Sequence, residues 1–288
     1  MNAVLYYRGS LTSCNYDCPY CPFGKTRDSA ATLAKDRQGL EAFVAWASEQ
    51  GAAGHRLSIF FNPYGEGLIH RWYKEAMIAL SNMDHVEKVA IQTNLSANLD
   101  FVSQMNRKKV AFWATYHPGQ VREDKFLAQC LTLYENDVPF SVGSVGIRSA
   151  FSAIASLRSA LPENVYLWVN AYKDKPDYYT AEDFVFLSEI DPHFSVNAMD
   201  YKSLGQACNA GKDVFYVQGA GLVKRCYKDR RVIGNLYRDG LEGLSAVRSC
   251  RMKVCDCYIG YIHMPELKLR SIYEAGLLER IPYGAMNN

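Results

Sequence analysis

Short runs of apolar residues alternate with longer amphipathic stretches along the first two thirds of the chain. The apolar runs predict six strands, near residues 3–8, 56–61, 87–92, 109–115, 139–145 and 164–170. The amphipathic stretches predict helices near residues 37–50, 68–81, 98–107, 122–134, 148–160 and 180–188. Continuously apolar strands that alternate with helices are typical of a parallel sheet. The pattern therefore predicts an α/β fold, a partial (β/α)6 barrel of the TIM type, with ligands at the carboxyl ends of its strands.

The pattern changes after about residue 195. The following segment is rich in glycine and cysteine and predicts short hairpins and loops, with one short helix near 239–248. Residues 265–280 have apolar positions at spacings compatible with a packed helix. We therefore expect a barrel, a small cysteine-rich C-terminal region, and a C-terminal helix with a tail: residues 1–195, 196–263 and 264–288.

Charge and hydropathy narrow the class of protein. The chain has 32 Lys and Arg against 30 Asp and Glu, a net charge of +2, and no long run of like charge. Charge therefore indicates neither nucleic acid nor an anionic membrane as a partner. The N-terminus lacks the features of a secretion signal, and no apolar run approaches the roughly 20 residues that span a bilayer. We expect a soluble cytoplasmic protein that binds neither membrane nor nucleic acid.

Nine cysteines call for an explanation in such a chain. In a reducing compartment, clustered thiols indicate metal or redox chemistry before disulfides. Cys130 stands apart, within a predicted helix, and is expected to be a small buried hydrophobic residue. The other cysteines form two groups: Cys14, Cys18 and Cys21, and then Cys208, Cys226, Cys250, Cys255 and Cys257.

The first group directly follows the first predicted strand, in the run Cys14-Asn-Tyr-Asp-Cys18-Pro-Tyr-Cys21. Thiolates suit iron–sulfur clusters and zinc. Three cysteines can each bind one iron of a cubane and leave the fourth iron open, whereas a ferredoxin closes that position with a fourth cysteine. A zinc knuckle and a chance spacing are the alternatives. Zinc would need a fourth ligand, and no histidine lies nearby in the loop.

This CxxxCxxC spacing, with an aromatic residue before the last cysteine, resembles the signature of the radical S-adenosylmethionine (SAM) superfamily. The resemblance implies a [4Fe–4S] cluster on Cys14, Cys18 and Cys21 whose open iron is chelated by SAM. Reductive cleavage of SAM then gives a 5′-deoxyadenosyl radical that takes hydrogen from the substrate. The resemblance also implies a reductant such as flavodoxin or ferredoxin. It places Tyr20 against the adenine, with a core tyrosine as the alternative.

Further positions resemble SAM contacts of the same family. Gly65 and Glu66 resemble its glycine–glutamate motif, which holds the SAM amino group, although Tyr64 replaces the usual first glycine and Gly67 the usual proline. A simple turn is the alternative. His117 is either a substrate contact or a structural residue. The remaining positions that the resemblance assigns to SAM lie on or at the ends of strands three to five: Thr93, Asn94, Thr115 and Ser141. An ordinary polar strand end is the alternative.

The second group begins with a C-x12-G-x4-C spacing that resembles the auxiliary-cluster region called SPASM in its long form and twitch in its shorter form. A full SPASM region has about seven cysteines for two clusters, and this chain has five. The resemblance therefore implies one auxiliary [4Fe–4S] cluster. We favour Cys208, Cys226, Cys255 and Cys257 as its ligands, with Cys250 as the main competitor. A four-cysteine zinc site is the alternative.

Three hypotheses for function follow. The first is a radical SAM enzyme that modifies a peptide or protein, and the second is radical dehydrogenation or rearrangement of a small metabolite such as a sugar. The third is a non-enzymatic iron–sulfur electron carrier or zinc-binding protein, which needs no open iron. Because strand one begins near residue 3, we expect no recognition domain before the barrel, which removes one cue for a long leader peptide but does not exclude a short one. The compact size and the single expected auxiliary cluster favour a small or short substrate. No catalytic acid or base is assigned, although Asp200, Tyr201 and Lys202 are candidates by position.

Overall fold

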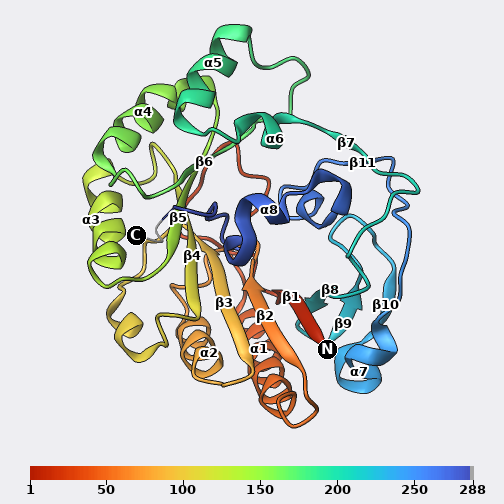
Figure 1. The fold of residues 1–288 in the computed structure, drawn as a ribbon. Coiled ribbons are helices and arrows are strands. Elements are labelled where there is room, and N and C mark those ends of the chain that lie inside the picture. Colours follow the sequence, from red (N-terminus) through yellow and green to blue (C-terminus); the bar gives the residue numbers. More distant parts are fainter. Residues whose placement is uncertain (286–288) are drawn as a thin grey trace.

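The computed structural model describes residues 1–285, and within them nine strands form one sheet in the order β10-β9-β8-β1-β2-β3-β4-β5-β6 (Figure 1). The first six strands are parallel and curve into an open, partial barrel. The six strands predicted from the apolar runs are therefore confirmed. Their bounds are β1 (Asn2–Arg8), β2 (Arg56–Phe61), β3 (Val86–Thr93), β4 (Val110–Tyr116), β5 (Phe140–Val145) and β6 (Leu167–Asn170).

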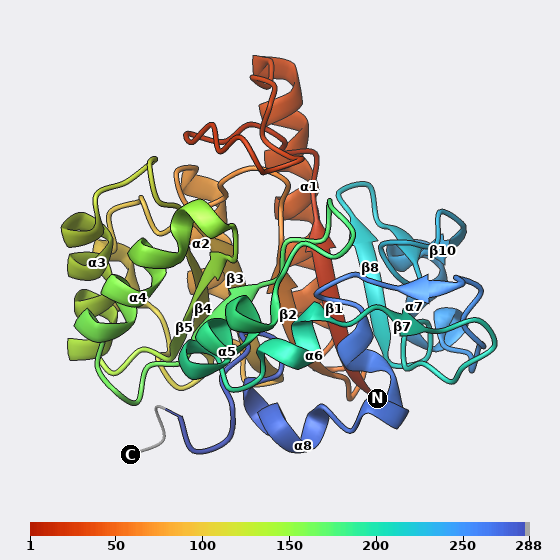
Figure 2. The same ribbon diagram turned by 90° about the horizontal axis from the view of Figure 1, so that it is seen from above.

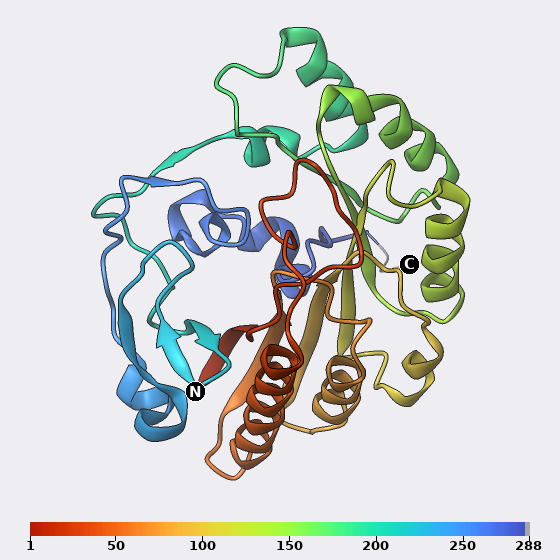
Figure 3. The same ribbon diagram turned by 180° about the vertical axis from the view of Figure 1, so that it is seen from behind.

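Helices cover the outer face of this sheet (Figure 3). They are α1 (Ala30–Glu49), α2 (Arg71–Ser81), α3 (Glu123–Glu135), α4 (Phe151–Ala160) and α5 (Ala181–Ile190). The side chain of Ser29 caps α1, and Thr180 forms a capping box with Asp183 at the start of α5. The helix predicted at 98–107 is only the 3-10 helix η1 (Asp100–Gln104), which ends where Met105 adopts an extended conformation. A second 3-10 helix, η2 (Arg148–Ala150), leads into α4.

The cysteine-rich region extends the same sheet. Strand β8 (Val214–Gln218) pairs in parallel with β1, and β9 (Leu222–Lys224) and β10 (Val232–Asn235) continue it as antiparallel hairpins. The predicted hairpins are present, but the sequence did not predict that they would join the barrel sheet. The remaining elements are α6 (Phe194–Ala198), α7 (Leu236–Leu244) and the paired strands β7 (Tyr201–Lys202) and β11 (Val254–Cys255).

The helix predicted at 265–280 is wrong. This segment contains the 3-10 helices η4 (Pro265–Leu267) and η5 (Glu274–Gly276) and the single turn α8 (Arg270–Tyr273), after η3 (Tyr261–His263). Positive φ angles at Lys268 (51°) and Glu274 (42°) interrupt any continuous helix. The apolar side chains of this segment pack against the inner face of the sheet and do not line up along one face of a helix. Of the predicted tail, residues 286–288 lie outside the described residues.

Two buried layers flank the sheet. The outer layer includes Tyr7 and packs under the helices, whereas Tyr6, Phe60 and Trp113 point to the inner face and pack against residues 259–278. Figure 2 shows α8 and the loop between β1 and α1 at opposite ends of the barrel. The C-terminal segment therefore closes one end and leaves the carboxyl ends of the strands open.

Candidate functional site

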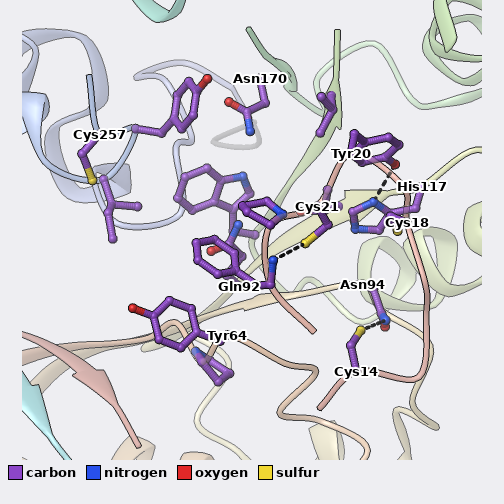
Figure 4. Close-up of a pocket in the computed structure, with 18 of the residues that line it drawn as sticks. Cys14, Cys18, Tyr20, Cys21, Tyr64, Gln92, Asn94, His117, Asn170 and Cys257 are labelled. Atoms are coloured by element: carbon purple, nitrogen blue, oxygen red, sulfur yellow. Dashed lines mark hydrogen bonds between the residues drawn. The ribbon is translucent and has the colours of Figure 1, made fainter. Parts of the chain in front are cut away.

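A cavity of about 490 Å³ lies at the carboxyl ends of the parallel strands (Figure 4). The loop after β1, the loops after β2 to β4 and the segment around Cys257 all contribute to its wall. Most of the predicted SAM-site residues line it, although they are spread over more than 100 positions of sequence. They are Cys14, Cys18, Tyr20, Cys21, Gly65, Glu66, Thr93, Asn94 and Thr115.

The loop that bears the first three cysteines is closed on itself by short-range contacts. The Asp28 carboxylate accepts hydrogen bonds from the main-chain N–H of Thr12 (2.7 Å) and Ser13 (2.9 Å) and from both hydroxyls. Partial burial would raise the pKa of Asp28, but these hydrogen bonds together hold it below its ordinary value. Gly24 adopts φ +69° and lies against Cys14, where a Cβ would approach the Cys14 Cβ to 2.8 Å.

The sulfur atoms of this loop accept main-chain hydrogen bonds. The N–H of Tyr16 donates to Cys14 Sγ and the N–H of Phe23 donates to Cys21 Sγ, both at 3.4 Å. Hydrogen bonds to cysteine sulfur are one means by which proteins tune iron–sulfur clusters. Burial raises the pKa of Cys14 above its ordinary value and that of Cys18 to about 11. A bound metal centre would supply the positive charge that deprotonates such thiols. The donor set therefore fits an iron–sulfur cluster.

The Gly65-Glu66 motif docks onto this loop. The N–H of Glu66 donates to the Ser13 carbonyl (3.2 Å). The Glu66 side chain, 2% exposed, accepts hydrogen bonds from Leu68 N (2.9 Å), Thr93 Oγ1 (2.8 Å) and Asn94 N (2.6 Å). Burial nevertheless raises its pKa. Glu66 thus joins the loop after β2 to the end of β3 at the cavity wall.

Tyr20 and His117 form one unit on the cavity wall. Tyr20 Oη lies 2.9 Å from His117 Nδ1, and the two rings stack at 6.0 Å between centroids. Burial lowers the pKa of His117 to about 4, so the imidazole is neutral near pH 7 and its Nδ1 can accept a hydrogen bond from the Tyr20 hydroxyl. Tyr20 is therefore held on the cavity wall, where part of its ring is available to a ligand.

The structure does not bring Ser141 to this cavity. Ser141 is opposite Trp113 in the register of β4 and β5, one inward layer below Thr115. It is fully buried, and its hydroxyl donates to the Glu279 carbonyl of the C-terminal segment. Of the described residues that line the cavity, none is Asp200, Tyr201 or Lys202, the candidates by position for an acid or base, although Asp200 pairs with the lining residue Lys173 at 3.0 Å.

The sequence did not predict many of the residues that line the cavity across from the first cysteine group. Arg8 and Asn170 end strands β1 and β6, so the position at a strand end could have indicated them. Trp113 and Trp168 lie within β4 and β6, where an apolar strand residue does not by itself mark a cavity wall. The others come from loops and from the cysteine-rich region, where no local pattern marks a cavity residue: Tyr64, Lys173, Tyr227, Lys228, Asp256 and Tyr258.

All five C-terminal cysteines, Cys208, Cys226, Cys250, Cys255 and Cys257, line a second, small cavity of about 30 Å³. Cys257 also lines the first cavity, so the two sites adjoin. Burial, together with the thiols of Cys257, Cys208 and Cys226, raises the pKa of Cys255 to about 12. Cys226 Sγ accepts a hydrogen bond from Asp229 N at 3.4 Å. Cys250 in turn raises the pKa of Cys208, so each of the five thiols is close enough to at least one other to interact electrostatically.

Two negative findings complete the geometry. Within residues 1–285, no three His, Cys, Asp or Glu side chains are arranged to hold a single metal ion. No helix in this part of the chain has both the length and the apolar character needed to cross a membrane. As expected, Cys130 is fully buried in α3, away from both cavities.

No family model and no curated protein matches the sequence. Among solved structures, the chain is similar to anSMEcpe with bound AdoMet (SAM) and the Cp18Cys peptide, at 15% identity and a TM-score of 0.55 over 85% of this chain and 80% of that one. It is also similar to SuiB of Streptococcus suis bound to SAM, at 16% identity and a TM-score of 0.56, over 83% of this chain and 64% of SuiB. The chain therefore has the fold of these SAM-bound proteins, and the partial barrel predicted from the alternation of strands and helices is confirmed.

Proposed function

We propose that this protein is a radical SAM enzyme that binds a [4Fe–4S] cluster through Cys14, Cys18 and Cys21. The observation that supports this most is the arrangement of these thiols with the Gly65-Glu66 loop around one cavity, at the carboxyl ends of the strands of a fold that SAM-bound proteins share. When bound, a reduced cluster of this kind supplies one electron to SAM and so produces the 5′-deoxyadenosyl radical that takes hydrogen from the substrate.

The residues of the chain position the reactants. Gly65 permits the loop after β2 to approach the cysteine loop, and Glu66 fixes it to Thr93 and Asn94. In this proposal the Gly65-Glu66 loop holds the amino group of SAM, as the family resemblance implies. Thr93, Asn94 and Thr115 face its methionine and ribose, and Tyr20 lies against its adenine, held by His117. Trp113 and Trp168 form an aromatic part of the lining and limit the water around the reacting atoms.

The second cavity is proposed to hold one auxiliary [4Fe–4S] cluster. Cys208, Cys226, Cys255 and Cys257 are the proposed ligands. The thiols of Cys208, Cys226 and Cys257 act on the pKa of Cys255, whereas Cys250 acts on that of Cys208 and is the competitor for a ligand position. Cys250 is then the spare thiol. Since Cys257 lines both cavities, the auxiliary site adjoins the space available to substrate.

We propose a peptide or protein as the substrate, and flavodoxin or ferredoxin as the class of reductant. The peptide bound to anSMEcpe, a protein of the same fold, supports the first point. The size of the cavity supports a substrate that inserts only a small group. SAM is a drug-sized ligand, and ligands of that size occupy pockets of about 300–1,000 Å³. One side chain of a peptide fits this requirement. The same limited space keeps a small metabolite such as a sugar as the second candidate.

Anaerobic reconstitution with iron and sulfide tests the proposal. We expect about eight irons per chain and 5′-deoxyadenosine after addition of dithionite and SAM. Replacement of Cys14, Cys18 and Cys21 by Ala should remove about four irons and abolish SAM cleavage. The Cys130→Ala variant is the matched control, because this thiol lies outside both cavities, and it should retain iron and cleavage.

The alternatives predict different results. SAM cleavage that survives in the triple variant would contradict the proposed site. A fully loaded, reducible cluster that gives no 5′-deoxyadenosine would favour an electron carrier. Zinc in place of iron in the second site, lost on replacement of Cys208 and Cys226, would contradict the auxiliary cluster.

A further inference from the structure

Arg8 is the cation of the cavity lining that has no carboxylate partner. The lining contains three cationic side chains among the described residues, Arg8, Lys173 and Lys228. Lys173 pairs with Asp200 at 3.0 Å and Lys228 with Asp256 at 2.7 Å. Within residues 1–285, Arg8 has no carboxylate oxygen within 4.0 Å.

The guanidinium of Arg8 is held in place by contacts that leave its terminal nitrogens free. Its Cζ lies 4.2 Å from the ring centre of Tyr64 and 4.7 Å from that of Tyr227. Its Nε donates to the Asn62 carbonyl at 2.8 Å. Nη1 is buried and has no partner among the described residues. Aromatic faces attract the charge, but they do not replace an oxygen acceptor for the N–H groups.

The position of Arg8 is between the two cysteine groups. Tyr64 packs at 4.6 Å against Phe23, which follows Cys21 by two residues, and Tyr227 directly follows Cys226. Figure 4 shows Tyr64 and Cys257 on the side of the cavity away from Cys18. A ligand group at Arg8 would therefore lie beside the substrate space and next to the second cavity.

We propose that Arg8 binds an oxyanion of the substrate, a carboxylate or a phosphate. The inference rests on the proposed function only in taking the anion to be part of the substrate, because the anion site itself is formed by residues of this chain. A planar guanidinium presents paired N–H donors that match two oxygens of one oxyanion, which a lysine ammonium cannot reproduce. The rings of Tyr64 and Tyr227, which both lie against the guanidinium, hold these donors in one orientation before the anion arrives, which lowers the entropic cost of binding.

Two other anions could account for the free guanidinium. One is the carboxylate of SAM itself. The other is the negative charge of the auxiliary site, because burial raises the pKa of Cys257 while the Arg8 charge acts in the opposite direction. The experiment must separate both from a substrate oxyanion.

The test uses the anaerobically reconstituted protein with SAM bound, titrated separately with acetate and with inorganic phosphate by calorimetry. We expect saturable binding of at least one of them. Arg8→Gln should weaken the anion affinity by about tenfold or more. Arg8→Lys should have a smaller effect, because lysine keeps the charge but lacks the paired N–H donors of the guanidinium. Arg107→Gln is the control, since Arg107 is exposed and outside the cavity, and it should bind as the wild type does. Preference for acetate indicates a carboxylate substrate, and preference for phosphate a phosphorylated one.

Three results would overturn the proposal. One is equal anion affinity in Arg8→Gln and the wild type. Another is weaker SAM binding in Arg8→Gln, which would assign Arg8 to the SAM carboxylate. The last is a shifted reduction potential of the auxiliary site with unchanged anion binding, which would assign Arg8 to the cluster. SAM cleavage without substrate is measured in parallel, so that loss of the proposed enzyme activity is distinguished from loss of the anion site. Arg8→Lys keeps the test valid if Arg8→Gln does not fold.

Discussion

The carbonyl oxygen of Ser13 occupies the space that a side chain at position 65 would need. A Cβ built on Gly65 would lie 1.8 Å from this oxygen, far inside van der Waals contact. The neighbouring N–H of Glu66 donates to the same oxygen. The glycine is therefore required by the close approach of two main chains, and its effect on the cysteine loop can be measured.

Gly65→Ala should separate the two loops and displace Cys14, because Ser13 directly precedes it. We expect the iron content to fall by about four per chain and SAM cleavage to be lost, with the fold retained by circular dichroism. Gly243→Ala is the matched control, since the nearest atom to its new Cβ lies at 3.7 Å, an ordinary contact. Full iron loading and SAM cleavage in Gly65→Ala would show that the docking of the loops is not needed.

The five cysteines of the second cavity should not be equivalent. We expect Cys255→Ala to lose about four irons, because its thiol interacts with those of three other proposed ligands. Cys250→Ala should keep the auxiliary iron. Iron analysis and electron paramagnetic resonance of the reduced proteins measure the difference. The opposite pattern would make Cys250 a ligand and Cys255 the spare thiol.

Arg280 should stabilise the closed end of the barrel. It is 1% exposed, its Nη2 donates to the Tyr258 carbonyl at 2.6 Å, and its Cζ lies 5.1 Å from the Trp113 ring centre. Arg280→Ala leaves buried carbonyls without donors and a cavity below Trp113, so we expect a loss of about 3 kcal/mol in the free energy of unfolding by urea. Arg270→Ala, at an exposed position of α8, should change it by less than about 0.5 kcal/mol. Equal effects of the two variants would refute a specific role for Arg280.

Asp191 should make stability depend on pH. Its carboxylate lies after α5 and accepts hydrogen bonds from Val169 N and His193 N, both at 2.9 Å, and from Tyr166 Oη. Burial outweighs these bonds and raises its pKa to about 6. Because the folded state binds this proton more tightly than the unfolded state, the contribution is fully present below about pH 4 and is lost as the pH rises through about 6.

The size of this contribution is about 2–3 kcal/mol, from a shift of about two pKa units. Urea unfolding between pH 4 and 7.5 should show the wild type losing this stability relative to Asp191→Asn, which has no proton to release. The comparison removes the effects of other titrating groups, such as His117. A difference between the two proteins that does not vary with pH would mean that Asp191 has an ordinary pKa.

Local patterns in the sequence predicted the parts of the molecule that depend on local interactions. The apolar run at 56–61 matches β2 residue for residue, because a buried parallel strand needs continuous apolar positions. Contacts within residues 12–28 likewise close the cysteine loop on itself, although its position also depends on Glu66, Gln120 and His117. The strand and the local closure of the loop need no knowledge of distant segments.

The errors concern contacts between distant segments. Ser141 points into the barrel, as Thr115 does. The alternation of side chains along a strand does not show how far from the open end of the barrel a residue lies. At the level of Ser141, the C-terminal segment occupies the barrel interior. The spacing of Leu267, Ile272 and Leu277 suggests a helix, but these side chains pack against the inner face of the sheet. Arg8 has no local signature either, because Tyr227, which defines its surroundings, lies more than 200 residues away.

The placement of residues 259–278 against the inner face of the sheet has a consequence for synthesis on the ribosome. Every strand whose inner face they cover is made before them, so Tyr6, Phe60 and Trp113 emerge without their packing partners. Strand β1 also waits for β8 to cover its edge. The nascent chain therefore carries an aromatic surface until its last segment arrives, and chaperones that bind exposed apolar surface would have the whole of that interval in which to act.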